Sequence, residues 1–188
     1  MATHNPGPRA ILLALALLLA AGLVAGCGPY RTYRGRPKAF STHPYRLVYP
    51  KGFEATELPQ MSREVVSLIV LAENKPIAPQ APEMPAIISV RCYRMHKQET
   101  PKTFMERYYD ELEPRFLDIE MRQVSNRPDA SEWTINVAPG YYAARVIVLP
   151  REKLAYDIMT VCKPSELERF KQVFQRARDS FQLLPARS

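Results

Sequence analysis

Hydrophobic and polar positions alternate along residues 44–188 in a way that predicts a series of strands. Large β-prone residues fill 45–49 and end at the turn Pro50-Lys51-Gly52. Similar patterns predict strands at 65–72, 86–95, 117–124, 132–137, 141–149 and 154–162. The last two are joined by a short polar link and are expected to form a hairpin. Four prolines between residues 75 and 85 exclude a central strand and predict a surface loop.

Two segments carry apolar positions at helical spacing. The first begins at Thr100-Pro101, residue types that suit the N-cap and the first helical position, and runs to about residue 113. The second has Ser165 as its expected cap, with Glu168 at capping-box spacing. Its apolar stripe comprises Leu167, Phe170, Val173, Phe174, Ala177 and Phe181. Such a stripe must be buried, so we expect an α+β fold with helices on the faces of a central antiparallel sheet of about six strands.

An apolar run of about 15 residues occupies positions 10–24 and precedes the sequence Val24-Ala25-Gly26-Cys27. The run has the length of a secretory h-region and is shorter than the roughly 20 residues of a bilayer span. The four residues resemble a bacterial lipobox, which implies removal of residues 1–26 and a lipid on Cys27. An uncleaved membrane anchor and an ordinary signal cleaved elsewhere are the alternatives. Gly28, in place of Asp, favours the outer membrane, facing the periplasm.

Residues 27–43 are expected to form a lipidated cysteine and a basic, flexible tether ahead of a single domain at 44–188. No periodicity is present in this segment, and its four cations are Arg31, Arg34, Arg36 and Lys38. These cations favour contact with an anionic membrane surface. A solvated spacer is an equally good interpretation.

Removal of residues 1–26 takes away one cation, Arg9, and leaves 25 Lys and Arg against 19 Asp and Glu, a net charge of +6. This excess suits an anionic neighbour such as lipid head groups, peptidoglycan or an acidic protein face. Export argues against nucleic acid. The expected partners are the membrane, through the lipid on Cys27, and an envelope protein.

Two cysteines remain in the exported chain, Cys92 and Cys162. A disulfide between them would close a loop of about 70 residues and contribute roughly 4 kcal/mol. The alternative is two buried thiols packed as small hydrophobic groups.

The chain offers little material for catalysis. Only His43 and His96 lie outside the signal, and no nucleophile elbow, zinc-protease helix or phosphate loop is present. We therefore expect a non-enzymatic accessory, assembly or binding protein without a cofactor, and we identify no small-molecule substrate. The alternative is an envelope metal-binding protein or enzyme using Cys92 and His96, a donor set that suits copper. The acidic residues Glu106, Asp110 and Glu113 are read as a solvated helix face.

Aromatic residues are frequent in the predicted sheet. Trp133, Tyr141, Tyr142 and Tyr156 would form a partner surface with Arg145 if exposed, but cross-strand packing is the favoured interpretation.

Both ends of the domain resemble PsbP-like domains. Residues 45–53 match the family's opening, in which a strand leads into Tyr-Pro-x-Gly-aromatic, with Phe53 where Trp is more frequent. The C-terminal part of the domain resembles the family's last strand and helix. It has Tyr156 in a predicted strand, followed by Phe174 through Asp179-Ser180-Phe181. The resemblance implies a central antiparallel sheet with helices on its faces. It also implies a binding or assembly role, and it transfers no catalytic residue.

Overall fold

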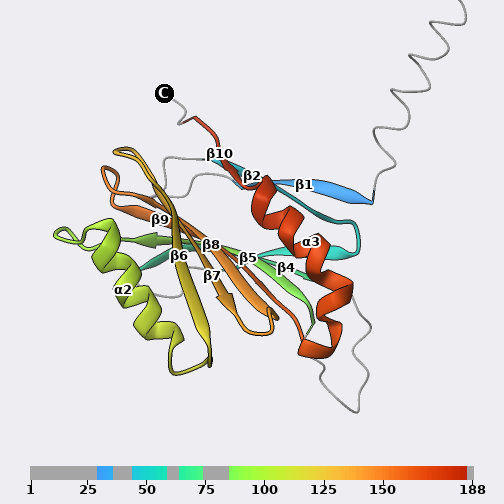
Figure 1. Cartoon of the computed structure of the whole chain (residues 1–188). Coiled ribbons are helices and arrows are strands. Elements are labelled where there is room, and N and C mark those ends of the chain that lie inside the picture. The colour runs from blue at the N-terminus through green and yellow to red at the C-terminus, as the bar shows by residue number, and fades with distance from the viewer. Residues whose placement is uncertain (1–28, 36–43, 59–63, 74–84, 186–188) are drawn as a thin grey trace, which may run out of the picture.

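The computed structural model describes residues 29–35, 44–58, 64–73 and 85–185 of the chain. Over these ranges the chain forms two antiparallel sheets, and two α-helices pack on opposite faces of the larger sheet (Figure 1). The predicted α+β class, with helices on a central antiparallel sheet, is confirmed. No helix in these ranges combines the length and apolar character needed to cross a membrane.

The larger sheet has seven strands within the described ranges, in the order β3-β4-β5-β9-β8-β7-β6. The strands are β3 Phe53–Leu58, β4 Val65–Glu73, β5 Ile87–Arg94, β6 Ile119–Asn126, β7 Ser131–Val137, β8 Tyr142–Leu149 and β9 Leu154–Val161. The predicted hairpin is confirmed, because β8 pairs with β9 over its full length. The prediction of about six strands omitted β3, where Phe53 is buried and the following residues are mostly exposed. The predicted loop at 75–85 lies almost entirely outside the described residues.

A smaller sheet consists of β1 Tyr30–Gly35, β2 Tyr45–Pro50 and β10 Gln182–Leu183, with β2 in the middle. The strand β1 differs from the expectation of little fixed structure between residues 28 and 43. Each of its six residues is in register with one of β2. The two strands approach closely at Gly35, where an added Cβ would lie 2.2 Å from the Tyr45 ring. Pairing with β2 therefore orders a segment whose own sequence has no strand pattern.

The helix α3, Leu167–Ser180, packs on one face of the larger sheet and beside β2. Phe170, Phe174 and Ala177 of the predicted stripe are buried in a core cluster with Leu47 of β2 and residues of β5 and β9. The expected cap at Ser165 is wrong. This residue lies inside the short 3-10 helix Pro164–Glu166, and α3 starts without a side-chain cap hydrogen bond.

The helix α2, Pro101–Leu112, covers the opposite face. Its predicted start is confirmed: Thr103 N donates to Thr100 Oγ1 at 3.2 Å, and Thr100 N donates to Thr103 Oγ1 at 2.9 Å. The predicted core positions Phe104, Tyr108 and Leu112 are buried in a second core cluster with residues of β7 and β8. The two helices thus separate the core into two clusters, one on each side of the sheet.

Candidate functional site

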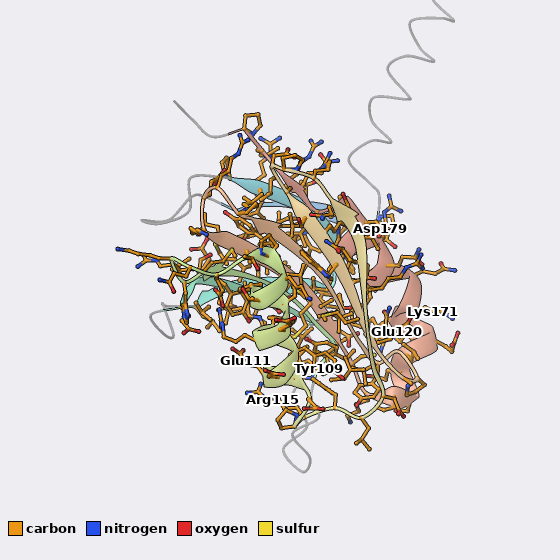
Figure 2. The ribbon with its side chains drawn as sticks, turned by 60° about the vertical axis from the view of Figure 1, so that its left-hand side comes forward. Tyr109, Glu111, Arg115, Glu120, Lys171 and Asp179 are labelled. Atoms are coloured by element: carbon orange, nitrogen blue, oxygen red, sulfur yellow. The ribbon has the colours of Figure 1, made fainter. Side chains whose placement is uncertain are left out.

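An open groove of about 420 Å³ lies between the N-terminal half of α2 and the edge of the larger sheet at β6 and β7. It is lined by Thr100, Pro101, Lys102, Met105, Glu106, Met121, Gln123, Asn126 and Trp133. The lining residues Thr100, Pro101 and Lys102 place the groove at the capped, N-terminal end of α2. Figure 2 shows Tyr109, Glu111 and Arg115 toward the C-terminal end of this helix. No pattern in the sequence indicated this groove.

Local structure and packing fix the wall and floor of the groove. The capping box at Thr100 holds the first turn of α2 in place, because it satisfies two backbone donors with side-chain oxygens. Met105 and Trp133 are 1% and 6% exposed, so only their edges reach the groove. Met121 of β6 is partly buried against the same core cluster. Methionine and tryptophan give such a groove an adaptable apolar lining.

The strand β6 forms one edge of the larger sheet and pairs only with β7 among the described residues. The two exposed large hydrophobic residues of the described chain lie in or next to it: Leu117 is 84% exposed and Val124 49% exposed. A bulge lies between Gln123 and Ser125, and Arg122 is exposed. Bulges and charges limit the pairing of an edge with other copies of a protein, but a free edge can still bind a matched extended segment.

A buried polar cluster lies on the same face of the sheet as α2, centred on Asp157 of β9. The Asp157 side chain is fully buried, and its Oδ2 accepts hydrogen bonds from Arg91 Nε at 2.8 Å and from the Tyr108 hydroxyl at 2.7 Å. Arg91 Nη2 also contacts Asp157 Oδ2 and donates to the Tyr108 hydroxyl at 3.1 Å. The Arg91 guanidinium lies 5.4 Å from the centroid of the Tyr93 ring. The cluster thus joins β5, β9 and α2.

The pKa shifts in this cluster favour an ion pair surrounded by neutral phenols. Burial raises the pKa of Tyr108, and the Asp157 charge raises it further. The same two causes raise the pKa of Tyr142 to about 12 and also raise the pKa of Tyr93. Burial by itself lowers the pKa of Arg91, but Asp157 outweighs it and the net pKa is raised. Arg91 therefore stays charged and the tyrosines stay neutral at physiological pH.

This cluster, too, was not predicted from the sequence. The available signal was an acid within an apolar strand, because Asp157 follows Leu154, Ala155 and Tyr156 and precedes Ile158. A buried charge requires a partner. The identity of that partner depends on the pairing of Asp157 with Arg91 in the β5–β9 ladder.

Cys92 and Cys162 are free thiols buried in the core cluster on the α3 side. The register of β5 and β9 pairs Cys92 with Tyr156 and Ile87 with Val161. Cys162, the next residue of the chain, therefore lies about 20 Å from Cys92 along the sheet. A disulfide requires Cα atoms less than about 7 Å apart, so of the two alternatives the structure supports two buried thiols and not a disulfide.

The proposed metal pair of Cys92 and His96 is not brought together. Cys92 is buried in the core, whereas the His96 side chain is 59% exposed beyond the end of β5, and its Nε2 lies 3.1 Å from Glu64 Oε1. No group of three or more potential ligands is present among the described residues. The neighbouring Arg107 contacts Glu99 at 2.8 Å and Glu64 at 3.1 Å, so these residues form an ion-pair network.

The acidic residues predicted to form a solvated helix face are exposed. Glu106, Asp110 and Glu113 all reach solvent, and Glu106 lies 3.7 Å from Lys102. The aromatic residues of the sheet behave as the packing interpretation expected. Trp133 and Tyr142 are buried in the cluster under α2, and Tyr156 is buried in the other cluster.

Two of the four predicted membrane-contact residues lie within the described ranges, and the other two lie outside them. Arg31 and Arg34 are exposed residues of β1. Arg36, Lys38 and the predicted lipidation residue Cys27 lie outside the described residues.

No protein-family model and no curated protein matches this chain. The solution structure of cyanobacterial PsbP (CyanoP) from Synechocystis sp. PCC 6803 aligns with 83% of this chain and 93% of its own, at 15% identity and a TM-score of 0.43. The crystal structure of LpqN, involved in cell envelope biogenesis of Mycobacterium tuberculosis, aligns with 84% of this chain and 93% of its own. Its identity is 14% and its TM-score 0.52, so the chain is similar to LpqN in fold.

Proposed function

We propose that this protein is a lipid-anchored component of the cell envelope that binds an extended segment of an envelope protein at β6. The observation that carries the proposal is the open groove between α2 and β6, next to a strand edge with an exposed Val124. Such a site acts by association and needs no reacting group. The expected location is the outer membrane, facing the periplasm.

The state of the potential reactive groups supports binding over catalysis. Asp157 is occupied by Arg91 and Tyr108 beneath α2, and His96 is paired with Glu64. The thiol of Cys92 is buried in the core. A nucleophile or a general base must reach a substrate, but Asp157 and Cys92 are buried, and the exposed His96 has Glu64 as its partner.

Anchoring rests on the lipobox that ends at Cys27. Acyl chains contribute about 0.8 kcal/mol for each buried methylene, so they hold a protein at a membrane without a spanning helix. The likeness in fold to LpqN, which is involved in cell envelope biogenesis, supports an envelope role for this chain too.

An extended segment fits both parts of the site. Its backbone would add to the free edge of β6, where main-chain hydrogen bonds supply affinity. Alternate side chains of a strand point to one face, so every second residue would enter the groove over Met105, Met121 and Trp133. Apolar residues at alternate positions are therefore the expected signature of the partner segment.

Site-specific photocrosslinking in living cells tests this site. A photoreactive amino acid at Gln123, which lines the groove, is expected to crosslink one reproducible envelope polypeptide. The matched control is Thr56, an exposed position on β3 at the opposite edge of the same sheet. Val124→Pro should abolish the product, because proline removes a backbone donor from the edge. Equal products from Gln123 and Thr56, or none from Gln123, would overturn the proposed binding site.

Mass spectrometry of the mature N-terminus tests the anchor separately. A diacylglycerol or triacyl mass on Cys27 is the expected result. An unmodified Cys27, or cleavage elsewhere, would remove the anchoring part of the proposal and leave the groove to be judged by crosslinking.

A further inference from the structure

The residue proposed to carry the lipid lies two positions before a fixed point of the fold. The Pro29 carbonyl accepts a hydrogen bond of 2.9 Å from Lys51 N, and the next residue, Tyr30, opens β1. Two residues span at most about 7 Å, so the Cα of Cys27 lies within that distance of Pro29. A free tether that extended to residue 43 would have allowed a distance on the order of 50 Å between Cys27 and the domain. A lipid on Cys27 would therefore hold this end of the domain against the bilayer.

Strand register shows which side of the small sheet faces outward. Opposite residues of an antiparallel pair lie on the same face. Tyr33 is opposite Leu47, and both belong to or pack on the core cluster. The alternate positions therefore face away from the core. They are Tyr30, Thr32 and Arg34 of β1, Arg46, Val48 and Pro50 of β2, and Gln182 of β10.

This outer face carries positive charge and no acidic residue on its three strands. Arg34 and Arg46 are exposed and directly opposite each other. Arg46 is held by Gln182 Oε1, which accepts from its Nε at 3.0 Å and from its Nη2 at 2.7 Å. Like charges at opposite positions destabilise a sheet unless an anion lies between them. The pair therefore suits a negatively charged ligand.

The helix α3 adds a cation next to the attachment point. The Arg176 guanidinium lies 4.2 Å from the centroid of the Tyr30 ring, and the Arg176 side chain is exposed. Asp179 is the nearest acidic residue along this helix. Figure 1 shows the small sheet beside α3, on the other side of the molecule from α2.

We infer that the outer face of the small sheet, together with Arg176, lies flat on the anionic head groups of the membrane. The inference rests on the proposed lipid at Cys27, because that lipid brings the face to the bilayer. Anionic lipid is the occupant because the surface is basic and its first residue, Tyr30, lies at most about 11 Å from the Cα of Cys27. In place of a flexible tether, a folded sheet sets the orientation of the domain.

Fluorescence quenching on vesicles tests this orientation. The full chain is purified from membranes and reconstituted into vesicles that contain anionic lipid and a quencher on the head groups. A dye is attached to a cysteine introduced at Thr32, on the outer face, or at Gln123, on β6. The buried native thiols Cys92 and Cys162 are shielded from the dye. Quenching should be several-fold stronger at Thr32 than at Gln123.

Charge variants test the electrostatic part. The double variant Arg34→Gln/Arg176→Gln should lower the ratio of this orientation to others by roughly 25-fold, which corresponds to about 1 kcal/mol for each arginine. The matched control, Arg115→Gln/Arg122→Gln, removes two exposed arginines, one just after α2 and one on β6, and should leave the ratio unchanged. High salt should act like the first variant.

The outcomes separate the inference from the proposed function. Lipid on Cys27 with equal quenching at Thr32 and Gln123, or with no effect of the first double variant, overturns the orientation alone. No lipid on Cys27, seen by mass spectrometry of the same preparation, overturns the anchor and the orientation together. Whether the groove binds a partner is decided separately, by the comparison of crosslinking at Gln123 and Thr56.

Discussion

Replacing Asp157 by Asn is expected to destabilise the protein strongly, although Asn has the same shape. The change removes the charge that pairs with Arg91, while one oxygen remains to accept from the Tyr108 hydroxyl. Removing one partner of a buried ion pair costs about 3–5 kcal/mol, because the other charge is left without compensation. The Arg91 side chain is 22% exposed and keeps some water, so we expect about 3 kcal/mol. For a domain of this size, this is a fall in Tm of roughly 6–12 °C.

A second substitution should restore part of this loss. Arg91→Met in the Asp157→Asn background removes the unpaired cation and keeps an apolar side chain beside Tyr93. Replacing a buried ion pair by apolar groups is often close to neutral. The double variant should therefore be about 2 kcal/mol more stable than the sum of the two single changes predicts.

Urea unfolding followed by tryptophan fluorescence measures all four proteins of this cycle. Trp133 is the single tryptophan, and it is buried in the cluster under α2 with Tyr108. Equal slopes with urea would show that stability, and not the unfolded state, has changed. A loss below 1 kcal/mol for Asp157→Asn, or additive effects in the cycle, would refute the interpretation of this cluster as a structural ion pair.

Three further outcomes follow from single contacts. Because Cys92 and Cys162 lie about 20 Å apart by strand register, a reducing agent should leave the Tm unchanged in calorimetry, and a fall of several degrees would contradict that register. The neutral form of Tyr142, with a pKa of about 12, is favoured by folding, so its contribution to stability is present below pH 10 and is lost as pH rises toward 12. Urea unfolding between pH 9 and 11, with tyrosinate absorbance as the check, should show that decline, and normal ionisation of every tyrosine in the folded protein would contradict it. Thr100→Ala should cost about 1 kcal/mol in the same unfolding assay and Thr100→Ser much less, because Ser can still accept from Thr103 N.

Regular patterns explain why much of the fold could be predicted. The helix α2 has its cap and its core positions at fixed spacing, so local sequence determines both its start and its buried face. The strands β8 and β9 are apolar enough to be recognised individually. By contrast, β1 is rich in arginine, and its order comes from pairing with β2 and from a close approach at Gly35. That pairing is a tertiary contact, and the pattern of β1 alone contains no sign of it.

The site was less accessible to sequence reasoning than the fold. The groove combines Met105 of α2 with Trp133 of β7, residues that approach each other only when the helix packs on the sheet. Cys92 and His96 are close in sequence and suggested a metal site, but the fold buries one and exposes the other. Proximity along the chain therefore indicated the wrong pair, and strand register indicated the right one, Arg91 with Asp157.

The two proposed surfaces lie on opposite faces of the larger sheet, and this arrangement has a functional consequence. The small sheet packs with α3 on one face, where the Tyr33 hydroxyl donates to Glu57 Oε1 at 3.0 Å. The groove lies on the other face, beside α2. With the small sheet on the membrane, the groove faces away from the lipid and is open to a partner. A long tether would let the groove take any height and direction. A link of two residues, from Cys27 to Pro29, fixes the height and direction of the groove above the membrane. Lengthening this link should therefore weaken crosslinking at Gln123 without changing the groove itself.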